Sequence, residues 1–191
     1  MKATATICIL FITGSLFGQP ELTGSLGLTF GMNQQSAKSI MASKKIDLAE
    51  STIKYLAYRN VPIGTMTANT VVVQFVNNKM HTIKVLFLPD LEAKSQELYN
   101  DLAEILTLKY GKAESYRHFK TPYEDGDGYE MQAVKLGKAD IASYWECANR
   151  RSVSLEIIPF ADKVGVTILY QDDVIYEELK AQQDKINVSD F

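Results

Sequence analysis

The chain has 191 residues, a length typical of one domain rather than two. Hydrophobic residues make up 46 % of the sequence and charged residues 23 %, a balance that is normal for a globular protein and excludes a disordered one. The formal net charge of −3 lacks the basic excess expected of a general nucleic-acid binder. The composition therefore predicts a folded domain without a nucleic-acid partner.

The N-terminal segment has the three-part pattern of a secretory signal peptide. Lys2 gives a positive start, and residues 7–12 form an apolar run. Small residues follow at Gly14, Ser15 and Gly18. The run is far shorter than the ~20 residues that cross a bilayer. We expect cleavage after Gly18, or alternatively after Ser15, and a secreted or periplasmic protein with no transmembrane segment.

The two cysteines of the chain are Cys8 and Cys147, and signal cleavage removes the first. The remaining thiol cannot form an internal disulfide, so the exported fold must be stable through packing. Cys8 lies inside the apolar run instead of behind it, which argues against lipid attachment.

A linker at 19–32, rich in glycine, threonine and leucine, is expected to end as a strand. Asn33 is a favourable N-cap for a short helix over about 34–43. Residues 47–58 fit either a strand or a helical turn, because their apolar side chains recur at both spacings.

The clearest element is a β-hairpin over 70–88. Two β-rich runs flank Asn77-Asn78, and asparagine tolerates the positive φ that a two-residue turn requires. Pro89-Asp90 then ends the strand and is expected to cap a helix over about 91–110. Gly111 follows, where a left-handed C-cap is typical.

The remainder is typical of an antiparallel meander followed by a helix. The candidate strands are 113–119, 129–137, 139–147, 152–159 and 163–171. A last helix is expected at about 173–185, capped by Asp172 or Asp173. The element order predicts an α+β fold in which an antiparallel sheet carries helices packed on one face. The predicted organisation is a signal peptide at 1–18, one domain at 33–186 and a frayed tail at 187–191.

Asp125 and Asp127, in a glycine-rich turn between Glu124 and Glu130, are the candidate metal ligands. Spaced carboxylates in such a turn suit a hard cation such as calcium. The calcium-loop spacing fails, because Tyr129 stands where the third acidic ligand belongs. An exposed loop is therefore the preferred interpretation, and no cofactor is expected.

The sequence contains no serine-nucleophile elbow and no phosphate-binding loop. Cys147 with His81 or His118 would be a thiol–imidazole pair, but strand alternation places Cys147 on the face of Trp145, as a structural thiol. The chain is therefore expected not to be an enzyme. An exported hydrolase that uses dispersed carboxylates is the alternative, with candidates Asp125, Asp127 and Glu146.

Aromatic residues are concentrated between positions 116 and 145. Tyrosine and tryptophan are enriched at protein interfaces, so we expect a protein-binding surface in this segment. Ordinary core packing is the competing interpretation. The candidate binding residues are Tyr116, Phe119, Tyr123, Tyr129, Tyr144 and Trp145.

The segment Phe30-Gly31-Met32-Asn33-Gln34-Gln35-Ser36-Ala37-Lys38-Ser39-Ile40 resembles the opening of small exported envelope proteins. Together with the helix-then-strands order, it is similar to the outer-membrane assembly lipoproteins of the SmpA/OmlA type and to the β-lactamase-inhibitor-like fold. The chain departs from that pattern, because it has no Gly-x-Pro after the helix and no lipidated cysteine. The resemblance implies a non-enzymatic binding or assembly role.

These observations predict an exported binding or assembly module of the cell envelope or the secreted fraction, with a protein partner. The alternatives are the exported hydrolase and a calcium-stabilised extracellular module.

Overall fold

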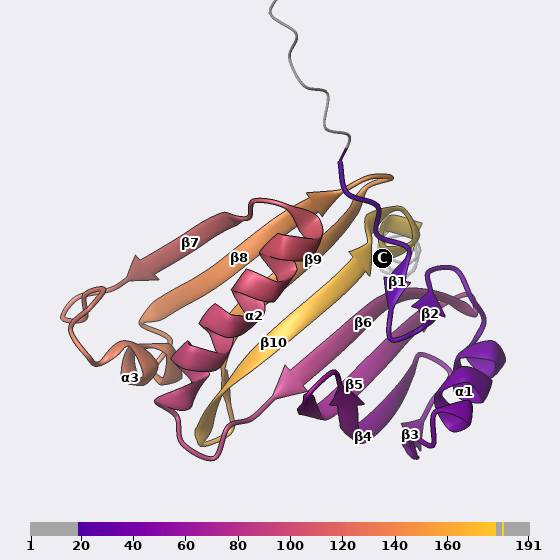
Figure 1. Ribbon diagram of the computed structural model, residues 1–191, viewed down its shortest axis with the longest axis horizontal. Helices are drawn as coiled ribbons and strands as arrows, with labels where there is room; N and C mark the ends of the chain where they lie inside the picture. The colour runs from indigo at the N-terminus through magenta and orange to yellow at the C-terminus, as the bar shows by residue number, and fades with distance from the viewer. Residues whose placement is uncertain (1–18, 179–180, 182–191) are drawn as a thin grey trace, which may run out of the picture.

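The computed structural model describes residues 19–178 and 181, and the predicted signal peptide and C-terminal tail lie outside them. The described residues form an α+β fold built on an eight-stranded antiparallel sheet and a separate two-stranded hairpin (Figure 1). Among the helices of this part of the chain, none is long and apolar enough to cross a membrane.

The N-terminal half supplies one helix and four strands of the large sheet. A small hairpin precedes them, within the predicted linker, and consists of β1 (Gly24–Ser25) and β2 (Leu28–Thr29). The half itself comprises α1 (Gln34–Ser43), β3 (Leu48–Ser51), β4 (Tyr55–Ile63), β5 (Met66–Val76) and β6 (Lys79–Phe87).

The C-terminal half repeats this order with one short helix inserted. It comprises α2 (Lys94–Tyr110), β7 (Glu114–Phe119), α3 (Glu130–Lys135), β8 (Ala139–Cys147), β9 (Arg151–Phe160) and β10 (Lys163–Asp172). Residues 173–178 then begin a further helix.

The strand order β3-β4-β5-β6-β10-β9-β8-β7 relates the two halves by an approximate two-fold arrangement. In each half a helix precedes four antiparallel strands that run in order from the outer edge to the centre. The last strands of the halves, β6 and β10, pair with each other, with Val85 opposite Ile168. A Cβ on Gly165 in β10 would lie 2.7 Å from Leu88 Cδ2 and 2.8 Å from the Phe87 carbonyl oxygen, so the halves meet at very close range there.

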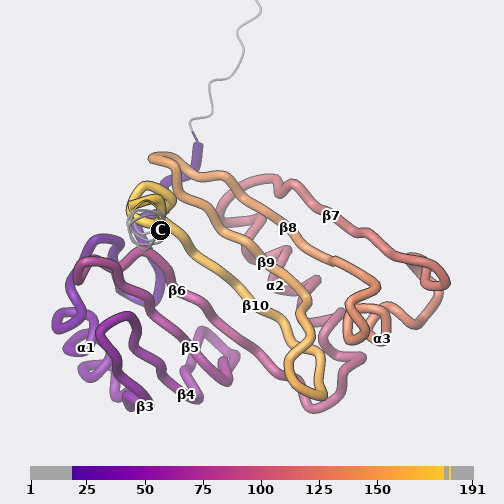
Figure 2. Tube along the Cα trace, turned by 180° about the vertical axis from the view of Figure 1, so that it is seen from behind, coloured from indigo at the N-terminus to yellow at the C-terminus, as the bar shows by residue number. Residues whose placement is uncertain are grey.

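Helices α1, α2 and α3 lie on one face of the sheet, which we call the covered face, and the opposite face is the open face. Helices α2 and α3 contact β8, β9 and β10, and α1 with the small hairpin lies on the same side over the first half (Figure 1). Viewed from behind, β7, β8 and β9 are uncovered, and the helix that follows β10 lies toward the viewer near β6 (Figure 2). Side chains alternate between the two faces. The covered face holds the largest buried residues, including Tyr58, Ile83, Ile141, Trp145 and Leu155.

Several predicted local signals are confirmed. Asn33 caps α1, and its Oδ1 accepts a hydrogen bond from the Ser36 backbone N–H at 2.8 Å. Asn77 and Asn78 have φ values of 47° and 60°, as a two-residue hairpin turn requires. Asp172 Oδ1 accepts from the Ile175 N–H at 3.1 Å, at the start of the last helix. The ambiguous segment 47–58 forms β3 and the beginning of β4.

Two sequence predictions are wrong. The predicted strand at 129–137 is helix α3, which buries Ala133 and Val134 and ends before Gly137. Over so short a segment, the spacing of its apolar residues fits both the helical period and the strand period. Helix α2 begins at Lys94 rather than at 91, and Ala93 at its N-cap position makes no side-chain capping bond. The predicted cap, Asp90, therefore lies outside the helix.

Arg151 joins the beginning and the end of the described chain. Its Nε donates a hydrogen bond to Asp172 Oδ2 at 2.8 Å, and a terminal guanidinium nitrogen donates to the Leu22 carbonyl oxygen at 2.9 Å. The guanidinium carbon lies 5.3 Å from the centroid of the Phe30 ring. The N-terminal segment is thereby fixed against β9 and β10.

Candidate functional site

Two of the six predicted binding residues, Tyr116 and Tyr144, lie on strands with their side chains exposed on the open face of the second half-sheet. In β8, the Trp145 side chain is buried and hydrogen-bonded to Gly111 at the end of α2, so its neighbour Tyr144 points to the open side. Tyr116 in β7 pairs with Ala142 in β8 and lies on the same side as Tyr144. Tyr116 is 50 % exposed and Tyr144 is 44 % exposed.

Tyr116 and Tyr144 border a hollow of about 350 Å³, which we call the acid–aromatic hollow. Its other open-face residues are Asp140, Ala142, Glu156 and Ile158. The depression forms because the small Ala142 side chain lies between larger neighbours. Strands β7, β8 and β9 fix these backbone positions through regular antiparallel pairing.

The carboxylates give this hollow a negative potential. Burial raises the pKa of the Tyr144 hydroxyl, and the charges of Glu156 and Asp140 raise it further. Glu156 Oε1 accepts a hydrogen bond from Ser154 Oγ at 3.0 Å, which orients the carboxylate on the face. The ring of Tyr116 stacks at 6.1 Å from that of His118. The arrangement suits a cationic group placed between the two tyrosines.

The structure separates the remaining predicted binding residues from this hollow. Trp145 is only 1 % exposed in the core, and its Nε1 donates to the Gly111 carbonyl oxygen at 2.9 Å. Phe119 and Tyr123 are partly buried and pack against the core. Tyr129 is exposed at the start of α3, where it borders a shallow depression together with Tyr123. Only Tyr116 and Tyr144 of the predicted six meet on the open face.

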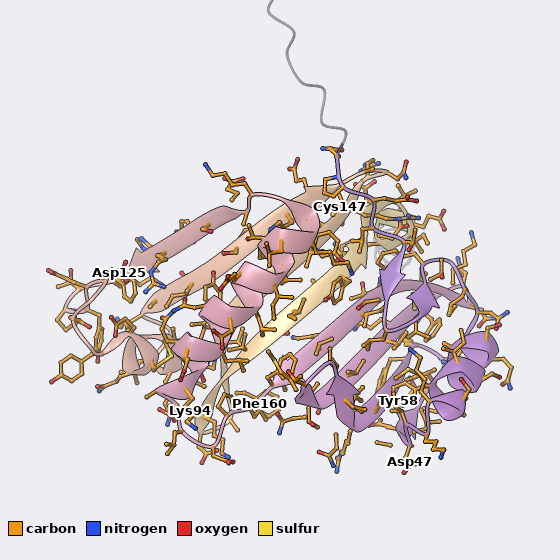
Figure 3. The ribbon with its side chains drawn as sticks, in the orientation of Figure 1. Asp47, Tyr58, Lys94, Asp125, Cys147 and Phe160 are labelled. Carbon is orange, nitrogen blue, oxygen red and sulfur yellow. The ribbon has the colours of Figure 1, made fainter. Side chains whose placement is uncertain are left out.

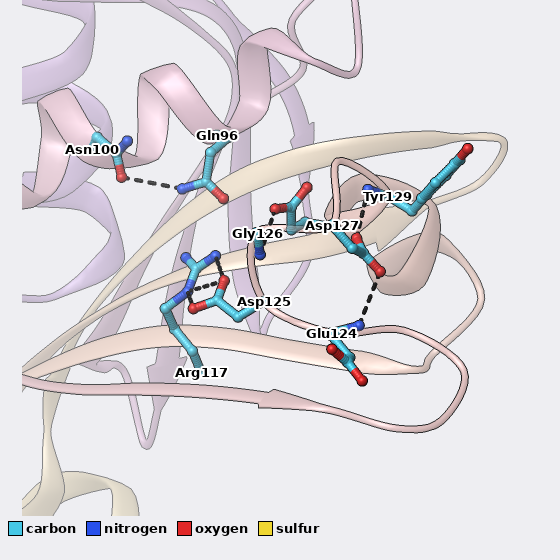
Figure 4. Close-up of polar contacts among 9 residues, drawn as sticks. Gln96, Asn100, Arg117, Glu124, Asp125, Gly126, Asp127 and Tyr129 are labelled. Carbon is cyan, nitrogen blue, oxygen red and sulfur yellow. Dashed lines mark hydrogen bonds and ion pairs between the residues drawn. The ribbon is translucent and has the colours of Figure 1, made fainter.

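The carboxylates of the predicted metal loop hold the loop itself together (Figure 4). Arg117 Nε donates to both oxygens of Asp125, at 3.0 and 3.1 Å, and these hydrogen bonds lower the pKa of Asp125. Asp127 accepts from the backbone N–H groups of Glu124 and Tyr129, at 2.9 and 2.7 Å. Within residues 19–178 and 181, no group of three or more His, Cys, Asp or Glu side chains is arranged to hold a metal ion.

Of the candidate carboxylates of the hydrolase alternative, Asp125 and Asp127 share the loop described above, and Glu146 lies apart from them near the end of β8. Asp125 and Cys147 lie at opposite ends of the second half-sheet (Figure 3), and Glu146 is the residue before Cys147. Burial raises the pKa of the Cys147 thiol, which lies on the covered face. His118 is on the open side of β7, and His81 is on β6. No thiol–imidazole pair is formed by these described residues.

A second hollow, of about 860 Å³, lies at the end of the first half-sheet where the β3–β4 turn and the tip of the β5–β6 hairpin meet, and the sequence did not predict it. Its apolar lining is Ile53, Phe75, Val76 and Tyr176. Four amide side chains, together with Lys54 and His81, complete the lining. We call it the amide-lined hollow. Tyr176 belongs to the helix that follows β10, which lies toward the viewer in Figure 2.

A β-bulge explains why strand alternation misplaces His81. Gln74 pairs with Thr82 and Phe75 pairs with Met80, so His81 is the extra residue of the pair. Alternation predicts that His81 shares the core face with Ile83. The bulge instead places it in the lining of the amide-lined hollow, 5.9 Å from the Tyr176 ring, with Thr82 Oγ1 at 2.7 Å from its Nδ1.

The two hollows occupy equivalent places in the two halves. Each lies beside the first connection between strands of its half and near the tip of the central hairpin, β5–β6 or β9–β10. Their charges are opposite, since Lys54 lines one and Asp140 and Glu156 line the other.

Comparison of this chain with models of known protein families, with characterised proteins and with solved structures found no match. Functional inference therefore rests on the two hollows and on the open face of the second half-sheet.

Proposed function

We propose that this chain is an exported, non-enzymatic binding module that holds a protein partner at the acid–aromatic hollow. The observation that carries this proposal is a pair of half-exposed tyrosines, Tyr116 and Tyr144, on β7 and β8, whose open side no described helix covers. Export is supported by the signal-peptide pattern of the N-terminal segment.

The chemistry of the hollow favours a partner that presents lysine or arginine. A guanidinium or ammonium group over a tyrosine ring is attracted by the ring electrons, and nearby carboxylates add a charge-assisted hydrogen bond. Tyrosine also loses little conformational entropy on binding, because it has few rotatable bonds. Asp140 and Glu156 are placed to supply the carboxylates.

The flat sheet around the hollow provides the rest of the contact. A stable protein interface buries roughly 800 Å² on each partner, more than the hollow alone supplies. In such interfaces a few central aromatic anchors carry most of the affinity, and the surrounding contacts exclude water. We expect Tyr116 and Tyr144 to be these anchors.

The test is in-cell crosslinking and recovery of the tagged mature chain from the organism that produces it, followed by affinity measurement with the purified partner. The double variant Tyr116→Ala/Tyr144→Ala should bind at least tenfold more weakly. Tyr129→Ala is the matched control, because this tyrosine is 61 % exposed and lies outside the hollow. Equal binding by the double variant and the wild type would overturn the placement, and recovery of the wild type as a solitary monomer would overturn the binding function.

A further inference from the structure

We propose that the amide-lined hollow is a separate site for a small amphipathic anion, a molecule with an alkyl or aromatic body and one carboxylate group. This site goes beyond the proposed protein-binding face, because it lies in the other half of the molecule and is lined by different residues.

The size and the walls of the hollow suit such a molecule. A volume of about 860 Å³ is within the range of ligand sites, which is roughly 300–1,000 Å³. Four segments distant in sequence form the walls: the start of α1, the β3–β4 turn, the tip of the β5–β6 hairpin and the helix that begins after β10. The β3–β4 turn is held in place by the Gln34 side chain, whose Nε2 donates to the Thr52 carbonyl oxygen at 2.7 Å.

The inner lining is apolar and aromatic. Phe75 and Val76 are buried, and the Tyr176 ring lies beside the buried His81 ring, 5.9 Å away and tilted by 41°. Ile53 is 89 % exposed at the rim, where it adds apolar surface to the mouth of the hollow. An alkyl or aromatic ligand body would contact these side chains and remove Ile53 from water.

The polar lining favours a negative group on the ligand. Lys54 carries a positive charge, and none of the described residues that line the hollow carries a carboxylate. Asn78 Oδ1 already accepts a hydrogen bond from the Gln34 backbone N–H at 3.0 Å, so the group that Asn78 can offer to a ligand is its NH₂ donor. A carboxylate would receive hydrogen bonds from such donors and a charge contact from Lys54.

The acid–aromatic hollow of the other half carries the opposite charge and should therefore not bind the same ligand. Asp140 and Glu156 would repel an anion there, so an anion should distinguish the two hollows.

The test is calorimetric titration of the mature chain with decanoate and with decylamine, which share an alkyl chain and carry opposite charges at neutral pH. We expect decanoate to bind at least tenfold more tightly than decylamine. Lys54→Glu should weaken decanoate binding at least tenfold, and it should preserve the fold because Lys54 is exposed. Lys84→Glu is the matched control: Lys84 is an exposed lysine of β6 outside the lining and should leave decanoate binding unchanged.

A second readout locates the bound molecule. In nuclear magnetic resonance spectra, decanoate should shift the resonances of His81 and Tyr176 and leave those of Tyr116 and Tyr144 unchanged. Equal affinity for the two probes, no effect of Lys54→Glu, or shifts confined to the acid–aromatic hollow would each overturn the proposal. None of these outcomes bears on binding of a protein at Tyr116 and Tyr144, so the two proposals fail independently.

Discussion

At the scale of single residues, Arg151 and Asp172 form the least exposed ion pair in the described part of the chain. The side chains are 21 % and 5 % exposed, and those of the other pairs are more open to water. A buried charge is costly unless it is paired, so either partner alone would be unfavourable. Asp172 also accepts the Ile175 N–H at the start of the last helix. One carboxylate therefore stabilises both a strand end and a helix start.

Asp172→Ala should lower the free energy of unfolding by roughly 3–5 kcal/mol, because it leaves Arg151 partly buried without a partner. Urea titration followed by circular dichroism measures this change. The control is Asp173→Ala, which removes only the hydrogen bond from Gln171 and should cost about 1 kcal/mol. Equal decreases in unfolding free energy for the two variants would contradict a larger contribution of the Arg151–Asp172 pair to stability.

His81 should make stability depend on pH. Burial lowers the pKa of His81 and the charge of Asp172 opposes this only in part. The unfolded chain, with an ordinary histidine pKa of about 6.5, then binds more protons than the folded chain in the window below that value. Stability should therefore fall as pH decreases from 7 through 6.5 and below.

The measurement is the unfolding free energy of the wild type and of His81→Gln at several pH values between 5 and 8. As pH falls, the unfolding free energy of the wild type should decrease more than that of His81→Gln. A difference that is constant across this range would contradict a lowered His81 pKa in the folded state.

At the scale of elements, two hairpin connections contain consecutive residues with positive φ. Asn77-Asn78 is the two-residue turn between β5 and β6, and the three-residue connection 148–150 between β8 and β9 has φ values of 62° at Asn149 and 55° at Arg150. Asparagine tolerates this conformation, whereas arginine pays a steric cost of roughly 1–2 kcal/mol. The second turn therefore carries local strain.

Arg150→Gly should raise the free energy of unfolding by about 1 kcal/mol, because glycine adopts positive φ without a clash. The variant also loses the ion pair of Arg150 with Glu177, which is exposed and contributes little. Urea denaturation gives the comparison. As a control, Lys84→Gly in β6 should cost about 0.5–1 kcal/mol, because glycine is unfavourable within a strand. A lower unfolding free energy for Arg150→Gly than for the wild type would contradict backbone strain at Arg150.

Comparison of the predicted elements with the structure shows which of them can be predicted from sequence. Asn33 and Asn77-Asn78 give reliable local signals, because their side chains and backbone preferences act within a few residues. Helix α3 was missed because six residues are too few to separate a helical period from a strand period. The start of α2 was placed too early because a turn at 91–93 separates the predicted cap from the helix.

The hollows were harder to predict than the strands. Tyr116 and Tyr144 were predicted as binding residues, but their meeting on one face depends on the β7–β8 register. The amide-lined hollow depends on a bulge that moves His81 and on Tyr176, which reaches the site from a helix after β10. Such long-range placements leave no local pattern in a single sequence.

At the scale of the whole molecule, the two halves share one sheet through the β6–β10 pair. The backbone of Gly165 lies so close to Leu88 and Phe87 that a Cβ would require a shift in the other half. A core that continues across this seam should make the halves unfold together, as small domains usually do.

Gly165→Ala should therefore lower the free energy of unfolding by roughly 1–3 kcal/mol, the usual cost of overpacking. Gly126→Ala is the control, since nothing lies within 4 Å of a Cβ there and only its positive φ opposes the change, at about 1 kcal/mol. Trp145 fluorescence reports on the second half and circular dichroism on both. Transitions that separate in the wild type would contradict a single cooperative unit.

The contacts of Arg151 with Leu22 and Asp172 also have a consequence for circular permutation of the chain. Arg151 holds both Leu22, just before β1, and Asp172, the last residue of β10, so the two ends of the described chain lie at the same corner of the molecule. A gene that linked these ends and opened the connection at 88–93 would encode the second half before the first. Every strand would keep its present neighbours, so a circularly permuted chain should form the same sheet.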